Sequence, residues 1–474
     1  MLRLFGGGGD HPLRNAREAQ RILGELPADD VKALDELAHW FESVASAEGF
    51  KLAERISVLA ALDDAGLPRA RKLAREYFAA TRPSRFQESR LWTALHDYWK
   101  HAAHALGHAL EPKAGAAAAA RAIRAGGQQV KWQHLRYAPG DPAAWGVMNG
   151  VFQFAEAASH AEAKLEYMKA LMLSTASPDS LVAVEIDMAE RVIADIAAGA
   201  LLEKRAAPGL PYWVDLARPA GPSRAMRSPE PSPTLRFFGA GDALPALQGM
   251  IQKLQAKREL PPSLSGVPDL DAALEVLLHL ALVWSPEPPE RRHVRHNVRS
   301  RLTVVHGFDA VLSALDDAPL ADFEQRRAES WVVENVSSGG FGAAVPQMKS
   351  DWLRVGSLLA LQPEGGTNWL VGIVRRVSRG TGSEARVGIE TLSRAPRKTA
   401  FRVRGLGTEP GVLLPSVTLG SNEVAVLLRG GVYPPGQNLD ASVDGREQIF
   451  VPIGRPEQGE DYDLMRFRQL VRES

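Results

Sequence analysis

Residues 331–346 read WVVENVSSGGFGAAVP. The apolar run at the start of this stretch predicts a β-strand that leads into Asn335. The carboxamide of Asn335 can both donate and accept hydrogen bonds, and Ser337 offers a hydroxyl. The glycines that follow permit a tight reversal with backbone N–H groups close to a ligand, and they are Gly339, Gly340 and Gly342. The stretch therefore predicts a strand that turns through a polar, ligand-accessible corner.

Short apolar runs separated by turn residues surround this corner. They are rich in Val, Leu, Ile and Trp and have no helical pattern between them, which favours a small six-stranded antiparallel β-barrel over residues 290–397. The expected strands are 298–305, 331–336, 342–345, 357–362, 368–376 and 386–392. Residues 398–474 continue in the same style with many glycines. We interpret them as a further C-terminal β-rich domain, with a degenerate barrel as one form it could take.

A cluster of arginines lies directly ahead of the first expected strand, where residues 290–301 read ERRHVRHNVRSR. The whole chain has 56 Lys and Arg and 56 Asp and Glu, so its formal net charge is zero and any anion site has to be local. The segment follows three prolines and precedes a strand, which predicts an extended or loop conformation. Spaced guanidinium groups in such a segment can wrap around a ligand.

Guanidinium groups suit a ligand that carries both phosphate and guanine. Their planar fork makes paired hydrogen bonds to phosphate oxygens, and the same fork matches the O6 and N7 edge of guanine. The flat face of the group can also stack on a base. Lysine would supply only the charge.

The sequence resembles the PilZ domain family, the bacterial receptors for cyclic di-GMP, because an arginine segment is followed by a polar, glycine-rich turn. The resemblance rests on Arg291 and Arg295 in ERRHVR, with Arg292 between them, and on Asn335, Ser337 and Gly340 in NVSSGG. The later segments WLRVGSLLALQ and RVGIETL are similar to the last barrel strands of that family, so the resemblance covers about residues 290–396. Arg295 and Arg299 repeat the spacing of Arg291 and Arg295, but the leading acidic residue and the double arginine favour the first pair.

The resemblance implies a function and a site. It implies that cyclic di-GMP is held between the arginine loop and the barrel wall, with Asn335 and Ser337 recognising a guanine. The expected ligand-binding residues are Arg291, Arg292, Arg295, Arg299, Asn335, Ser337, Gly339, Gly340 and Gly342. The long stretch 311–330 between the first two strands suggests an inserted helix. No catalytic residue, metal or further cofactor is implied.

The N-terminal part of the chain has a different pattern. From residue 14 to 202 it is rich in Ala, Leu, Glu and Arg with apolar residues three and four apart, which predicts an all-helical domain over residues 1–205. Seven prolines crowd residues 206–233, and two strand-like pieces and two helices follow or flank them, so we expect residues 206–289 to be a connecting α/β segment. The expected helices are 29–46, 49–61, 68–80, 85–107, 114–125, 143–174 (more than one piece), 180–198, 244–257 and 269–284. The fold class is therefore multidomain α+β.

Composition excludes several classes of protein. A length of 474 residues favours about three domains, and the absence of cysteine excludes disulfides, thiolate metal sites and cysteine nucleophiles. The N-terminus has no apolar core long enough for a secretory signal, and the apolar segment 270–284 is too short to cross a bilayer. We expect a cytoplasmic protein without membrane insertion. Phosphate-binding GKS or GKT loops, HExxH and GxSxG are absent, so no enzyme is expected.

Two other constellations in the helical part have alternative interpretations. Asp97, His101, His104 and His108 fall at helical spacings on one face, as a metal site would require, but histidines in helical bundles more often bond a neighbouring carbonyl or carboxylate. Four tryptophans could form a stacking platform for nucleic acid, but their apolar surroundings suit core packing better. We expect neither a metal nor a nucleic acid polymer as a partner. The tryptophans are Trp92, Trp99, Trp132 and Trp145.

The sequence thus favours a cyclic di-GMP receptor or effector. Ligand binding to the arginine segment would change the arrangement of the domains or the binding of an unidentified protein partner through the helical domain. The alternative is a protein-interaction scaffold whose PilZ-like barrel binds no nucleotide.

Overall fold

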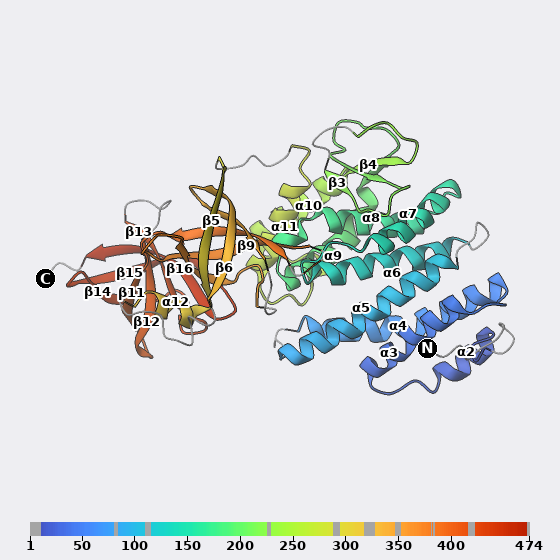
Figure 1. Ribbon diagram of the computed structural model, residues 1–474, viewed down its shortest axis with the longest axis horizontal. Helices are drawn as coiled ribbons and strands as arrows, with labels where there is room; N and C mark the ends of the chain where they lie inside the picture. Colours follow the sequence, from blue (N-terminus) through green and yellow to red (C-terminus); the bar gives the residue numbers. More distant parts are fainter. Residues whose placement is uncertain are drawn as a thin grey trace. The chain divides into compact units, whose positions relative to one another are not determined.

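The computed structural model describes residues 11–79, 84–109, 115–224, 229–287, 294–316, 328–346, 352–380, 382, 384–415 and 422–471. Within the chain, residues 1–290 and residues 291–474 form two compact units. Figure 1 shows helices and a small sheet in the first unit, coloured blue to yellow-green, and mainly strands in the second, coloured olive to red. This is the multidomain α+β class that the sequence predicts.

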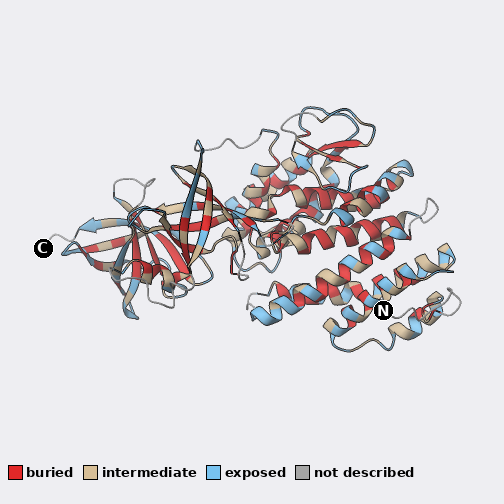
Figure 2. Cartoon of the chain, viewed as in Figure 1, coloured by how far each residue is buried: buried red, intermediate tan, exposed pale blue. Residues whose placement is uncertain are grey.

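The first unit is a helical array completed by a small sheet. Each long helix buries one apolar face, and α5 packs on both α3 and α6. Figure 2 shows these buried faces turned toward one another. The helices are α2 (Ala16–Leu23), α3 (Asp30–Ser46), α4 (Leu52–Tyr77), α5 (Arg85–His108), α6 (Ala116–His134), α7 (Pro142–Ala157), α8 (Ala161–Thr175), α9 (Ala183–Ile196), α10 (Ala243–Lys257) and α11 (Leu270–Val283).

Two helices run further than the sequence pattern predicts. The expected break before residue 68 is wrong, because α4 continues through the exposed Pro68. Burial of Val58, Leu59, Leu62 and Leu73 on either side of the proline outweighs the roughly 3 kcal/mol that an internal proline costs a helix. The expected end of α6 near residue 125 is also wrong. The helix continues through Gly126, where the glycine is required by packing and does not end the helix. A Cβ at Gly126 would lie 2.6 Å from Cγ of Met148.

The segment between the helical array and the barrels shares the core of the array. Its antiparallel sheet has the order β1-β4-β2-β3. Tyr212 and Leu277 belong to the same apolar cluster as Ile193 of α9. The strands are β1 (Leu201–Glu203), β2 (Tyr212–Asp215), β3 (Ser223–Arg224) and β4 (Leu235–Gly239).

The second unit begins with a closed six-stranded antiparallel barrel, as the sequence predicts. Its strand order is β10-β7-β6-β5-β8-β9. A short helix, α12 (Phe308–Ala314), stands between the first two strands where an inserted helix was expected, and residues 317–327 of that stretch lie outside the described residues. The strands are β5 (His296–His306), β6 (Glu329–Ser337), β7 (Gly340–Val345), β8 (Leu358–Pro363), β9 (Leu370–Arg379) and β10 (Ala385–Ser393).

The C-terminal β-rich part is a second closed barrel with strand order β11-β12-β13-β16-β15-β14. Phe401, Phe450 and Phe467 fill its interior and are fully buried. Side chains of α12 and of both barrels form a further shared apolar cluster, which includes Phe308 and Val412. The strands are β11 (Arg397–Val403), β12 (Gly407–Pro415), β13 (Glu423–Arg429), β14 (Leu439–Val443), β15 (Arg446–Gln458) and β16 (Tyr462–Val471).

Candidate functional site

The polar corner predicted from residues 331–346 is the hairpin between β6 and β7. Ser337 and Gly340 are the last paired residues of the two strands, and the Ser337 hydroxyl donates to the carbonyl oxygen of Gly340 at 3.4 Å. The carbonyl oxygen of Gly339 accepts a hydrogen bond from the Thr391 backbone N–H at 3.0 Å. The neighbouring strand β10 therefore holds the turn in place.

Two of the expected glycines are required by close contacts. A Cβ at Gly340 would lie 1.9 Å from the backbone oxygen of Ile389 in β10, so no larger residue fits without moving a strand. A Cβ at Gly342 would lie 2.6 Å from Nδ2 of Asn335. The structure thus gives these glycines a role that the sequence does not show, since Gly342 makes room for the Asn335 side chain.

Asn335 points to the outer face of the barrel because of a β-bulge. The register of β6 against β7 shifts between Val333 and Asn335, so that Asn335 pairs with Gly342 while Val333 pairs with Ala343. Val333 and Ala343 are buried inside the barrel, which puts Asn335 and Ser337, two residues apart, on the outside. Within the described part of the chain the Asn335 carboxamide makes no hydrogen bond, so its donor and acceptor are available.

Arg295 adjoins this corner. In the ladder of β5 and β6, His296 pairs with Val336 and Asn297 with Asn335. The residue before His296 is Arg295 and the residue after Val336 is Ser337, so the antiparallel register places Arg295 next to the Ser337 end of β6. The structure therefore brings Arg295 together with Asn335 and Ser337.

The other expected arginines differ in what the structure describes. Arg299 lies in β5 where the register against β6 shifts, between Asn297 and Ser300. Both Arg295 and Arg299 are exposed, and neither forms an ion pair with any carboxylate in the described ranges. Arg291 and Arg292 lie outside the described residues.

One further cation at the corner is not predicted by the sequence analysis. Arg394 follows β10, and its guanidinium donates to the carbonyl oxygen of Ser338 in the turn at 3.2 Å. Like Arg295, it is exposed and has no carboxylate partner among the residues that the structure describes. In the sequence, only the basic run RAPRK at residues 394–398 indicates a cation here. The contact of Arg394 with the turn depends on the strand order of the barrel.

Other arginines on this barrel are already engaged by acids. Arg386 pairs with Glu334 at 3.4 Å, and Arg375 pairs with Glu390 at 2.7 Å and also with Glu457 of the second barrel. Burial of the Arg375 guanidinium lowers its pKa, but the hydrogen bonds and charges of Glu457 and Glu390 outweigh burial and raise the pKa overall. Arg295 and Arg394 at the β6–β7 corner differ from them, since neither has a carboxylate partner among the described residues.

The histidine set in α5 does not assemble into a metal centre. Asp97 is 3.0 Å from Nδ1 of His96 instead, and the rings of His104 and His108 meet edge to face with centroids 4.3 Å apart. The pKa of His104 is lowered, first by burial and then by the charges of His108 and His101. In the described residues no group of three or more His, Asp or Glu side chains has a metal-binding arrangement.

The four tryptophans belong to the helical core. Trp99, Trp132 and Trp145 are buried, and Nε1 of Trp92 donates to the carbonyl oxygen of Trp132 at 2.7 Å. The guanidinium of Arg136 covers the Trp92 ring at 3.9 Å. Their faces are therefore occupied by the protein itself and form no exposed stacking platform.

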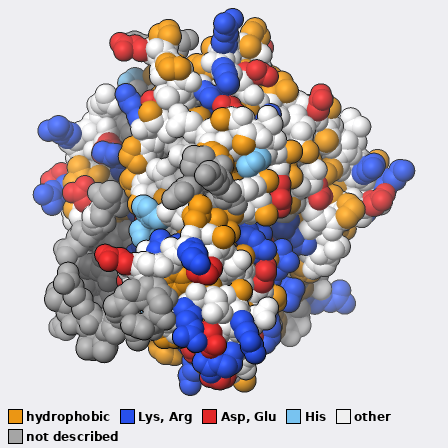
Figure 3. Space-filling model, turned by 90° about the vertical axis from the view of Figure 1, so that its right-hand side faces the viewer, with side chains coloured by type: hydrophobic (Ala, Val, Ile, Leu, Met, Phe, Trp, Pro, Cys, Tyr) orange, Lys and Arg blue, Asp and Glu red, His pale blue; other side chains and the backbone are white. Residues whose placement is uncertain are grey.

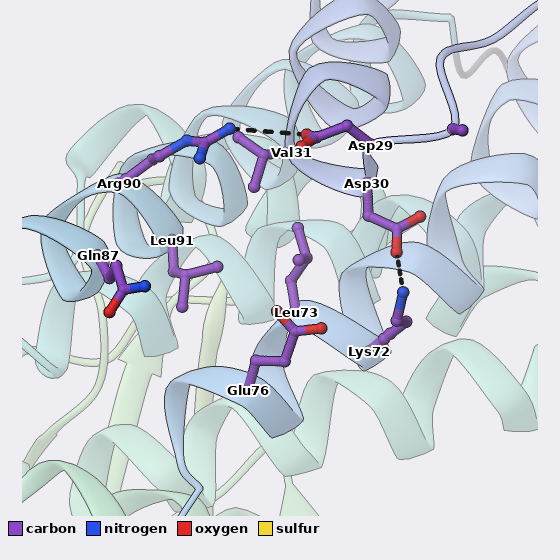
Figure 4. Close-up of a pocket in the computed structure, with 10 residues that line it drawn as sticks. Asp29, Asp30, Val31, Lys72, Leu73, Glu76, Gln87, Arg90 and Leu91 are labelled. Atoms are coloured by element: carbon purple, nitrogen blue, oxygen red, sulfur yellow. Dashed lines mark hydrogen bonds and ion pairs between the residues drawn. The ribbon is translucent and has the colours of Figure 1, made fainter. Parts of the chain in front are cut away.

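The helical unit also contains a cavity of about 540 Å³ among α3, α4 and α5 (Figure 4). Ion pairs cross its rim, with Asp29 and Arg90 3.7 Å apart and Asp30 and Lys72 2.6 Å apart. The hydrogen bond from Lys72 is the main cause of a lowered pKa at Asp30. Among the described residues, none that the sequence analysis expects to bind a ligand lines this cavity.

One face of the molecule shows mixed charge. On the face drawn in Figure 3, basic and acidic side chains lie close to one another, in keeping with the net charge of zero. A search of the helices in the described ranges finds none with the length and apolarity needed to cross a bilayer.

Comparison with protein families gives two matches. Residues 17–207 match the family model described as the N-terminal domain of the cyclic-di-GMP receptor FimW, and residues 318–397 match the model of the middle PilZ domain of that receptor. Together the matches cover more than half of the 474 residues. The second match contains β6, β7 and β10, and therefore the whole polar corner. No curated protein matches the sequence significantly.

Proposed function

Because the chain belongs to the FimW family of PilZ-containing cyclic-di-GMP receptors, we propose that it binds cyclic di-GMP at the β6–β7 corner of its first barrel. The observation that supports this site is the register of β5 and β6, which places Arg295 beside Ser337 and Asn335. Two segments about 40 residues apart in sequence thus supply the two kinds of group that a guanine dinucleotide requires.

The proposed division of roles follows from the chemistry of the ligand. Arg291, Arg292 and Arg295 hold the phosphates and stack on or bond to a guanine, with Arg299 as the alternative partner of Arg295. Asn335 and Ser337 bond the edge of a guanine or its ribose. Gly339, Gly340 and Gly342 keep the turn open to the ligand. A cyclic dinucleotide carries two phosphate charges, and the cations without acid partners at this corner offset them.

The proposed function is reception of the signal and not its chemical conversion. The family is one of receptors, and we assign no catalytic residue. The segment with Arg291 and Arg292 joins the two compact units along the chain. We propose that binding of this segment to the ligand changes the arrangement of the units, and that the helical unit presents the resulting surface to a protein partner.

Isothermal titration of the full chain with cyclic di-GMP tests the site. We expect binding by the parent protein and a loss of affinity of at least about tenfold in Arg291→Ala/Arg295→Ala and in Asn335→Ala, because each removes charge-assisted or paired hydrogen bonds. Arg468→Ala, which removes an exposed strand arginine of the second barrel, is the matched control and should bind as the parent does.

Two results would overturn the proposal. No heat of binding at micromolar ligand would exclude a receptor function and favour a scaffold whose barrel has no nucleotide role. Binding by the parent together with unchanged affinity in both site variants would place the ligand elsewhere in the chain.

A further inference from the structure

A guanidinium to which the sequence analysis gave no role lies at the turn of the polar corner. The Arg394 guanidinium donates to the carbonyl oxygen of Ser338 at 3.2 Å. Ser338 directly follows Ser337, the last residue of β6 that pairs with β7. Arg394 is therefore bonded to the residue next to an expected ligand-binding hydroxyl.

The strand order puts two arginines on the two sides of this turn. In the barrel order the neighbouring strands are β10, β7, β6 and β5, and the turn joins the middle two. Arg295 precedes β5, and the ladder of β5 with β6 places it next to the Ser337 end. Arg394 follows β10, which pairs with β7 on the other side. The two guanidinium groups therefore come to the corner from the strands on either side of it.

The Arg394 guanidinium has donors left for a ligand. An arginine side chain carries several N–H donors, and the contact with the turn uses one of them. Arg394 is exposed and has no carboxylate partner among the described residues. The other two cations of the run RAPRK differ, since Arg397 pairs with Asp444 at 2.8 Å and Lys398 pairs with Asp316 at 2.5 Å. Within the described part of the chain, Arg394 is thus the cation of this run whose charge no acid offsets.

The backbone next to Arg394 is held by both barrels. Thr391 of β10 donates its backbone N–H to the carbonyl oxygen of Gly339 in the turn at 3.0 Å. Ser393 is fully buried, and its hydroxyl donates to the carbonyl oxygen of Pro415 in β12 at 2.9 Å. These bonds place Arg394 at the turn before a ligand arrives. A group that is already in position loses less conformational entropy when it binds.

We propose that Arg394 is a further ligand-binding residue and that its guanidinium bonds a phosphate of cyclic di-GMP on the side of the turn opposite Arg295. This inference rests on the proposed function and adds a residue from outside the arginine segment and the NVSSGG turn. A cyclic dinucleotide carries two phosphate charges, so cations on both sides of the turn match its charge distribution. Hydrogen bonds from a guanidinium to phosphate oxygens are charge-assisted and stronger than neutral ones.

A role in holding the turn alone predicts a different result from a bond to the ligand. Arg394→Gln separates the two, because glutamine keeps an N–H donor for the Ser338 carbonyl oxygen but has no charge. If Arg394 only holds the turn, this variant keeps the parental affinity. If the guanidinium bonds a phosphate, the variant loses affinity, and the loss is larger at low salt, where charges are less screened.

Isothermal titration of the full-length variants with cyclic di-GMP at low and at high salt tests the inference. For Arg394→Gln we expect about tenfold weaker binding than the parent at low salt, because a charge-assisted hydrogen bond is lost, and a smaller difference at high salt. Arg394→Lys keeps the charge without the planar fork and should recover part of the affinity. Arg397→Gln changes the arginine of the same run that pairs with Asp444, so it is the matched control and should bind as the parent does.

The outcomes separate this inference from the proposed function. If the parent binds and Asn335→Ala loses affinity while Arg394→Gln keeps it, Arg394 does not bind the ligand, although the receptor function holds. A loss in Arg394→Gln that is equal at low and high salt also overturns the inference. If the parent binds no cyclic di-GMP, both proposals are wrong. Weaker binding in Arg394→Gln that approaches the parent at high salt, with an unchanged melting temperature, supports the inference.

Discussion

The carboxamide of Asn335 occupies the space that a side chain at position 342 would fill, so the asparagine and the glycine act as a pair. Sequence spacing shows both residues but not this dependence, because they come together only through the β6–β7 register. At the residue scale, the Asn335 carboxamide can take its position only because residue 342 has no side chain. The absence of a Cβ is as important here as the presence of a donor.

Gly340 gives a stability prediction at this scale. Gly340→Ala would bring Cβ to 1.9 Å from the Ile389 carbonyl oxygen. The Cβ is fixed to the backbone of β7 and the oxygen belongs to the backbone of the paired strand β10, so the two strands must separate. We expect a loss of roughly 1–3 kcal/mol and a lower melting temperature of the barrel transition in calorimetry. Gly150→Ala, in an exposed helical position with no heavy atom within 4 Å, is the control and should be neutral or stabilising. An unchanged barrel transition in Gly340→Ala would contradict the close approach of these strands.

At the element scale, the C-terminal end of α6 contains a partly buried titratable group. His134 is 3.3 Å from the Ser174 hydroxyl and 3.3 Å from the Ala138 carbonyl oxygen. Burial lowers the pKa of His134 from 6.5 to about 4, with the Ala138 hydrogen bond acting in the opposite direction. Folding therefore favours the neutral imidazole. Between the two pKa values the unfolded chain binds a proton at His134 that the folded chain does not bind, and this lowers the stability of the helical array.

This gives a pH prediction. The contribution of the neutral His134 to the free energy of unfolding is fully present above pH 6.5 and is lost as the pH falls from 6.5 toward 4. The loss is about 1.4 kcal/mol for each unit by which the two pKa values differ. His134→Gln cannot titrate, so its melting temperature should fall less than that of the parent between pH 7 and pH 4.5. His39→Gln, at an exposed position of α3, should follow the parent curve. Parallel curves for the parent and His134→Gln would show that burial does not suppress protonation there.

The elements were largely predictable where local patterns determine them. The apolar runs and glycine turns of residues 298–392 correctly predicted six strands and a closed barrel, and the helical spacing predicted most helices of the first unit. Pro68 misled the prediction because tertiary burial outweighs a local penalty. The Asn335 and Ser337 corner was predictable because its residues are adjacent in sequence. The contact of Arg394 with the turn was not predictable, since it forms only when barrel closure sets the strand order and register.

At the scale of the whole molecule, the two barrels of the second unit are joined by a common core. Phe308 of α12 is fully buried between residues of both barrels, and its backbone N–H donates to Oδ2 of Asp461 at 2.6 Å. Arg429 of β13 pairs with Asp309, and Arg375 of β9 pairs with Glu457 of β15. These contacts indicate that the barrels are stabilised as one cooperative unit.

Phe308→Ala tests this cooperativity. Truncation leaves a cavity in the shared core and should cost about 3–5 kcal/mol. Hydrogen exchange followed by mass spectrometry should then show faster exchange in β8 of the first barrel and in β13 of the second barrel alike. Leu406→Ala, at a side chain that is 56% exposed, is the control and should change neither. Faster exchange confined to the first barrel would show that the barrels unfold independently.

The central claim is that guanidinium groups ahead of β5 and the polar corner between β6 and β7 bind one guanine dinucleotide. A crystal structure of the full chain grown with excess cyclic di-GMP tests it most directly. We predict electron density for the ligand in contact with Arg295, Asn335 and Ser337. Density for the dinucleotide at another place, such as the cavity beside Asp30 and Arg90, with this corner empty, would contradict the account.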